Sequence, residues 1–109
     1  MENNKLIAEF MELEVDNGLY CYTTAMDDYK TDTLYFDSSW DWLMPVVDKI
    51  ESFEDDNRCC KYNVKIEQCW TEIIDNKTSD RIVLVDADDK KLSTFKAIVV
   101  FIKRIKKNT

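Results

Sequence analysis

The stretch that most constrains the fold is residues 38–53, which read SSWDWLMPVVDKIESF. Its apolar side chains recur at the spacing of one helical face, and a stripe this wide must be covered by the rest of the chain. Serine is a favourable N-cap, and Asp41 follows Ser38 by three residues, as in a capping box. The sequence therefore predicts a central helix whose buried stripe consists of Trp40, Leu43, Met44, Val47 and Ile50.

Pro45 sets two alternatives for the start of this helix. Proline lacks the N–H that would donate to the carbonyl of Asp41, and its ring presses on that carbonyl. Either the helix begins at Asp41 with Pro45 in its first turn, or it begins at Ser38 and kinks. We favour the second, because Trp40 belongs to the stripe. On this register Trp40 is a core residue and Trp42 is half-exposed at the rim, where the alternative role for Trp42 is a binding anchor.

Three strings of the chain resemble a known set of proteins: WDWLMPVVDKIE at residues 40–51, MENNKLIAEFM at residues 1–11 and FKAIVVFIK at residues 95–103. They are similar to a widespread family of short, uncharacterised phage and bacterial proteins, in which Glu is common at the position of Asp48. The resemblance covers both ends and the middle of the chain and leaves the connecting segments unmatched. It implies a phage or prophage context, and it brings no activity and no catalytic residues.

The remaining patterns predict one α+β domain over residues 1–109, with N-terminal, central and C-terminal helices packed on an antiparallel sheet of about four strands. We expect the first helix over residues 3–13, ended by Asp16, Asn17 and Gly18, and a polar loop over residues 25–32. The strands are expected within residues 19–23, 33–36, 60–67, 70–74 and 81–85. The last of these is apolar throughout and is expected at the sheet centre or covered on both faces. Asp86, Asp88 and Asp89 are expected to cap the last helix.

The charge is distributed unevenly between the two halves of the chain. Residues 1–56 carry 15 acidic and three basic side chains, whereas residues 57–109 carry seven acidic and 12 basic ones. Folding brings the halves together, so part of this asymmetry is internal complementarity. The remainder should survive as an acidic face, which repels nucleic acid and attracts basic protein surfaces.

Several classes of chemistry are excluded or disfavoured by composition. The chain has no His, so neither a Ser–His nor a Cys–His pair can form, and a single Gly cannot supply a phosphate-binding loop. Cys21, Cys59, Cys60 and Cys69 lack the C-x-x-C spacing of a zinc site and are expected as reduced, buried or half-buried thiols. Because these groups are missing, no metal or other cofactor is predicted, and we expect the protein not to be an enzyme. Neither a membrane span nor a signal peptide is recognised, so we expect a cytoplasmic protein.

These expectations combine into a hypothesis about function. The sequence predicts a phage-type interaction protein that binds and inhibits a basic, nucleic-acid-handling host protein such as a CRISPR effector, without binding nucleic acid in general or a membrane. Its predicted contact residues are Asp27, Asp28, Asp32, Trp42, Glu54, Asp55 and Asp56. Two alternatives remain. One is an accessory or regulatory subunit that self-associates through exposed aromatic side chains. The other is a small-molecule binder in which Trp40, Trp42, Trp70 and nearby tyrosines line a pocket.

Overall fold

The computed structural model describes residues 2–24, 26–55 and 57–107, and it confirms the α+β class. The helices and strands follow one another as α1 (Glu2–Phe10), β1 (Glu14–Asp16), β2 (Leu19–Thr23), β3 (Asp28–Thr31), α2 (Trp40–Glu51), β4 (Tyr62–Ile66), β5 (Trp70–Asp75), β6 (Asp80–Asp86) and α3 (Lys90–Lys107). Instead of one sheet of about four strands, these residues form two antiparallel sheets of three strands, in the orders β1-β2-β3 and β4-β5-β6.

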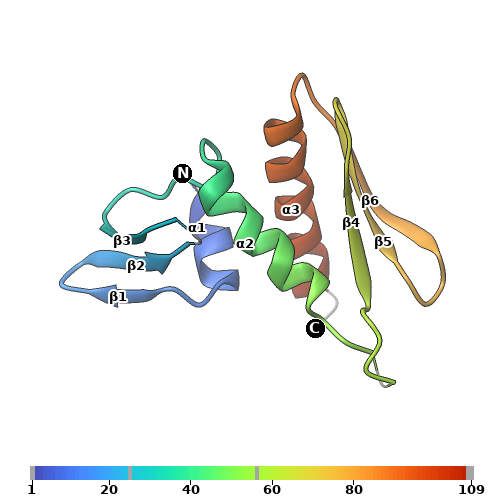
Figure 1. Ribbon diagram of the computed structural model, residues 1–109, viewed down its shortest axis with the longest axis horizontal. Coiled ribbons are helices and arrows are strands. Elements are labelled where there is room, and N and C mark those ends of the chain that lie inside the picture. Colours follow the sequence, from blue (N-terminus) through green and yellow to red (C-terminus); the bar gives the residue numbers. More distant parts are fainter. Residues whose placement is uncertain (1, 25, 56, 108–109) are drawn as a thin grey trace.

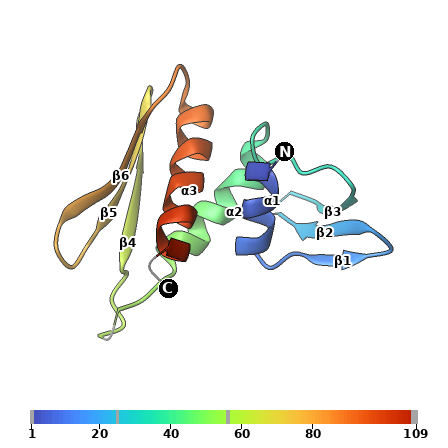
Figure 2. The same cartoon turned by 180° about the vertical axis from the view of Figure 1, so that it is seen from behind.

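The helices lie between the two sheets, as the opposite views of Figures 1 and 2 show. α3 packs along β5 and β6, α2 crosses from the first sheet towards β4, and α1 packs against α3. The core runs through this helical layer, and Ile7, Leu43, Ile50, Ile98 and Phe101 are fully buried in it. Each sheet therefore presents one face to the helices and the other to solvent.

α3 follows the sequence prediction closely. The backbone N–H of Leu92 donates to the Asp89 carboxylate at 2.7 Å, so Asp89 caps the helix. The helix is also fixed to β5 by buried hydroxyl groups, because the Thr71 hydroxyl lies 2.8 Å from that of Ser93 and 3.1 Å from that of Thr94. These bonds satisfy polar groups that burial would otherwise penalise.

The first sheet differs from the prediction in two places. α1 ends at Phe10, because Glu12 takes a left-handed conformation with a φ of 56°, and the N–H of Leu13 donates to the carbonyl of Ala8 at 3.2 Å, as in a Schellman motif. Asn17 and Gly18, with φ values of 55° and 80°, form the turn of the β1–β2 hairpin rather than a helix stop.

The predicted loop at residues 25–32 is wrong over residues 28–31, which form β3; residues 26, 27 and 32 lie outside any strand, and residue 25 lies outside the described residues. The predicted strand at residues 33–36 is wrong, because these residues carry no strand. Phe36 is nevertheless fully buried, and it enters the core from an irregular segment. The polar residues of β3 are compatible with a strand because only one of its faces is covered.

β6 is an outer strand of the second sheet, and β5 is the central one. The prediction that residues 81–85 are central or covered on both faces is therefore wrong. The side chain of Leu84 is 47% exposed on the face turned away from α3.

α2 begins at Trp40 with Ser39 as its N-cap, so the predicted start at Ser38 is wrong, and the Ser39 hydroxyl makes no capping bond. The assignment of the two indoles is also reversed: Trp42 is 1% exposed, whereas Trp40 is only half-buried. Residues two apart on a helix point about 200° apart. Only one of the two tryptophans can therefore face the aromatic side chains of the first sheet, and Trp42 does so.

Candidate functional site

Trp42 is the centre of an aromatic cluster that joins the first sheet to α2. Its ring lies 4.6 Å from that of Tyr22 on β2, 5.1 Å from that of Tyr29 on β3, 5.3 Å from that of Tyr35 and 5.1 Å from that of Phe36. The Tyr22 hydroxyl also donates to the main-chain carbonyl of Trp42 at 2.8 Å. These contacts fix the position of β3 relative to the beginning of α2.

A groove of about 580 Å³ lies beside this cluster. β3 forms one wall, and the segment that leads into α2 forms the other. The residues that line it are Asp28, Tyr29, Lys30, Thr31, Tyr35, Ser38, Ser39 and Trp42. Because β3 is an outer strand of its sheet, the groove runs beside an unpaired strand edge.

The hydrogen-bond pattern shows which backbone groups face this edge. The N–H of Thr24 donates to the carbonyl of Asp27 at 2.9 Å, so these two residues face each other as a hydrogen-bonded pair. In an antiparallel ladder, pairs that exchange backbone hydrogen bonds alternate with pairs that do not. Tyr29 and Thr31 therefore bond to β2, while Asp28 and Lys30 direct their backbone groups outwards. The N–H of Asp28 donates to the Asp27 carboxylate at 2.8 Å, so it is already occupied. The edge thus offers the Asp28 carbonyl and both backbone groups of Lys30.

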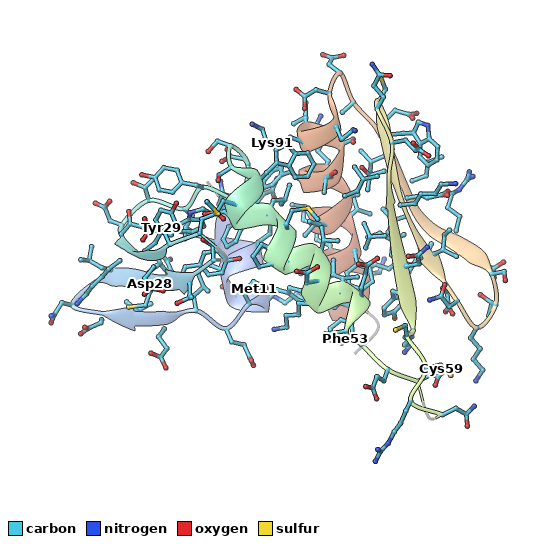
Figure 3. All side chains as sticks on the ribbon, in the orientation of Figure 1. Met11, Asp28, Tyr29, Phe53, Cys59 and Lys91 are labelled. Carbon is cyan, nitrogen blue, oxygen red and sulfur yellow. The ribbon has the colours of Figure 1, made fainter. Side chains whose placement is uncertain are left out.

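The surroundings of the groove are acidic. Residues 26–42 contain five acidic side chains and one basic side chain, Lys30. The Lys30 ammonium pairs with the Asp16 carboxylate at 2.8 Å, which offsets its charge. A second ammonium group, that of Lys91 on α3, donates to the carbonyl of Ser38 at 3.1 Å, and Figure 3 labels this residue beside the beginning of α2. The five carboxylates still outnumber these two cations.

The polar groups within the cluster stay in defined protonation states. Burial, and then the Asp41 carboxylate, raise the pKa of Tyr22 and of Tyr29, so both remain hydroxyl donors at neutral pH. Asp41 accepts from the Thr24 hydroxyl at 2.7 Å and from the Tyr29 hydroxyl at 3.4 Å. The buried indole N–H of Trp42 approaches the Tyr29 hydroxyl and opposes the rise in the pKa of Tyr29, although the contact falls short of full hydrogen-bond geometry.

The predicted contact residues fall at two separate places. One place is β3, close to the groove: Asp27 and Asp28 lie at its beginning, and Asp32 follows its end. Glu54 and Asp55 lie on the loop after α2. Figure 3, which labels Asp28 and Tyr29 in one region and Cys59 far from them, shows this separation. Asp56 lies outside the described residues.

Asp55 has a structural role in its loop. Its carboxylate accepts the backbone N–H of Asn57 at 2.8 Å and that of Cys59 at 3.0 Å, and these bonds lower its pKa. Trp42 is buried rather than half-exposed, so its predicted place at the rim is wrong, although it lines the groove.

Sequence reasoning missed Tyr29, Lys30 and Tyr35 as groove residues. The sequence carries no clear signal for them, because Asp28, Tyr29, Lys30 and Thr31 alternate in exposure only once β3 is paired with β2. Trp42 lines the groove, whereas Trp70 lies on the second sheet beside Arg81 and Leu84, so these two tryptophans lie at different places.

The cysteine prediction is only partly right. All four are free thiols; Cys21 is half-buried as expected, whereas Cys59, Cys60 and Cys69 are exposed. Over residues 2–24, 26–55 and 57–107, no group of three Cys, Asp or Glu side chains is arranged to hold a metal ion. None of the helices in these same ranges has the length and apolar character needed to cross a membrane.

No protein-family model, no curated protein and no solved structure matches this chain.

Proposed function

We propose that this chain is a non-enzymatic interaction protein of phage or prophage type, whose acidic end binds a basic, nucleic-acid-handling host protein in the cytoplasm and inhibits it. The acidic end comprises residues 2–42, which form α1, β1–β3 and the first turn of α2. It carries ten acidic and two basic side chains, whereas α3 carries seven basic and no acidic ones. This segregation of charge is the observation that supports the proposal most.

The ion pairs of the described residues leave most of these charges unneutralised. β1–β3 lie on the far side of α1 and α2 from the second sheet (Figure 1). The Lys30–Asp16 ion pair lies within the acidic end and the Arg81–Glu72 ion pair lies within the second sheet, while the Lys106–Glu9 pair joins α3 to α1. Every acidic residue of the acidic end except Asp41 is exposed, although Asp16 and Glu9 are held in ion pairs.

Electrostatic complementarity supports the class of partner. Proteins that handle nucleic acid carry Lys and Arg side chains in grooves that follow the phosphates. An acidic surface is attracted to such a groove and competes with the nucleic acid for it. Inhibitors of CRISPR effectors and of other defence proteins act in this way, and a phage context agrees with the resemblance of residues 40–51.

Self-association is the second candidate, and the open edges of the first sheet favour it. β1 and β3 are both outer strands, and Val15 on β1 is 60% exposed. Sedimentation of the purified protein distinguishes the candidates, because a stable dimer at micromolar concentration would favour self-association.

The test begins with a partner captured from a bacterial lysate and purified. We expect its affinity for this protein to fall steeply with salt, because exposed charges are screened within about 10 Å at 0.1 M salt. The variant Asp28→Lys/Asp32→Lys should slow association more than it speeds dissociation. The matched control is Asp80→Lys/Asp86→Lys, which makes the same change in net charge at exposed positions of β6. Equal effects of the two variants, or no dependence on salt, would contradict the proposal.

A further inference from the structure

We infer that the groove beside β3 binds an extended, basic peptide segment, which adds to β3 as a fourth strand of the first sheet. The basic character of the segment rests on the proposed function, whereas its extended conformation rests on the strand edge alone.

The backbone of β3 is arranged for this addition. Lys30 directs both its N–H and its carbonyl away from β2, so an incoming residue can exchange two hydrogen bonds with it. The carbonyl of Asp28 offers a further acceptor two residues away. Main-chain bonds of this kind give affinity in strand addition, and pockets for alternate side chains give specificity.

The side chains on both sides of the edge suit a basic segment. Alternate side chains of an added strand point to opposite faces of the sheet. On the helix-facing side they meet Tyr29 and Tyr35, whose rings can cover the stems or the cationic heads of Lys and Arg. On the solvent-facing side they meet Asp28 and Lys30. The Lys30 ammonium is paired with the Asp16 carboxylate, and Asp27 and Asp32 lie at the two ends of the strand.

Trp42 couples the groove to the core. The residue is 1% exposed and lines the groove, and its indole N–H approaches the Tyr29 hydroxyl. A segment bound beside Tyr29 would therefore change the surroundings of this N–H.

Charge argues against a second copy of this chain as the occupant. Pairing two β3 edges would bring together two segments that each carry five carboxylates within residues 26–42. Like charges placed opposite one another destabilise strand pairing.

The probe is an acetylated and amidated peptide of alternating arginine and valine, titrated calorimetrically into the full chain. The critical variants are Lys30→Pro, which removes the outward N–H, and Lys30→Ala, which keeps it; both lose the ion pair with Asp16. Proline is tolerated on an outer strand where the N–H faces outwards, so the sheet should persist. We expect Lys30→Pro to bind the peptide at least about tenfold more weakly than Lys30→Ala does.

Two further measurements complete the test. The same peptide methylated on its backbone nitrogens should lose binding to the unaltered protein, which gives an answer even if Lys30→Pro does not fold. A glutamate–valine peptide should bind at least about tenfold more weakly than the arginine peptide. In ¹⁵N spectra the indole N–H signal of Trp42, identified by its absence in Trp42→Phe, should shift on binding.

Equal binding by the two Lys30 variants, or full binding of the methylated peptide, would overturn strand addition. A dimer of the protein alone that Lys30→Pro dissociates would assign the edge to a second copy instead. These outcomes are separate from those of the proposed function, because the peptide titrations do not involve the captured partner.

Discussion

Trp42 is the single residue whose loss we expect to destabilise the protein most. Truncating a buried large aromatic side chain costs about 3–5 kcal/mol, because apolar burial is lost and a cavity remains. Trp42→Ala also removes ring contacts to Tyr22, Tyr29, Tyr35 and Phe36. The matched control is Trp40→Ala, which should cost clearly less because Trp40 is half-buried. Urea unfolding of both variants measures the difference, and equal losses would contradict this account.

The stability of the protein should also depend on the Tyr22 hydroxyl at alkaline pH. Burial, followed by the carboxylates of Asp41 and Asp48, raises its pKa above the ordinary value of 10.0. Above pH 10 the unfolded chain releases this proton and the folded chain keeps it. The free energy of unfolding should therefore be unaffected below pH 10 and fall above it, with a slope on the order of 1.4 kcal/mol per pH unit from this group.

Tyr22→Phe tests the alkaline effect. It loses the hydrogen bond to the carbonyl of Trp42 at every pH, but its stability should fall less steeply above pH 10 than that of the unaltered protein. Unfolding curves between pH 8 and pH 11 supply the comparison. Parallel curves for the two proteins would exclude Tyr22 as the group responsible.

At the scale of elements, the loop between α2 and β4 should depend on the ionised form of Asp55. Its two backbone hydrogen bonds lower its pKa below 3.8, so its contribution to stability is present above that pH and is lost as the pH falls through the lower folded value. Asp55→Ala should lower the melting temperature at pH 7, and the difference should shrink under acid conditions. Glu54→Ala, at an exposed neighbouring position, should leave the melting temperature nearly unchanged. A difference that persists at pH 2 would argue against the ionised carboxylate.

The elements that the sequence predicted well are those with one unambiguous period. In β4, half-buried Tyr62, Val64 and Ile66 alternate with exposed Asn63 and Lys65, as expected for a strand covered on one face. α3 has a long apolar stripe and an aspartate cap.

β3 escaped prediction because its exposed positions are as polar as those of a loop, and only its pairing with β2 makes it a strand. In α2 the predicted burial of Leu43, Val47 and Ile50 is confirmed, but Trp42 and Val46 are buried in place of Trp40 and Met44. The two ends of α2 face different sheets, which the helical period does not record. No local pattern records which tryptophan meets Tyr22.

For the molecule as a whole, the sequence predicted that an acidic surface would survive folding, and the acidic end agrees with that. It could not show that Asp28 and Asp55 lie far apart, because the distance between β3 and the loop after α2 depends on the path of α2 between them. The groove could not be predicted either. It requires the outer position of β3 and the approach of residues 35–39, which the topology of the first sheet decides.

The acidic end lies at one extremity of the molecule, and α3 with its seven basic side chains lies behind it. In the field of a cationic surface this uneven distribution of charge experiences a torque before any contact is made. The molecule would therefore turn as it approaches, and it would arrive with the groove of β3 foremost. Because ions of the solution damp this field within a Debye length, the fraction of collisions with the correct orientation should decline as salt rises, even where the final contacts are apolar.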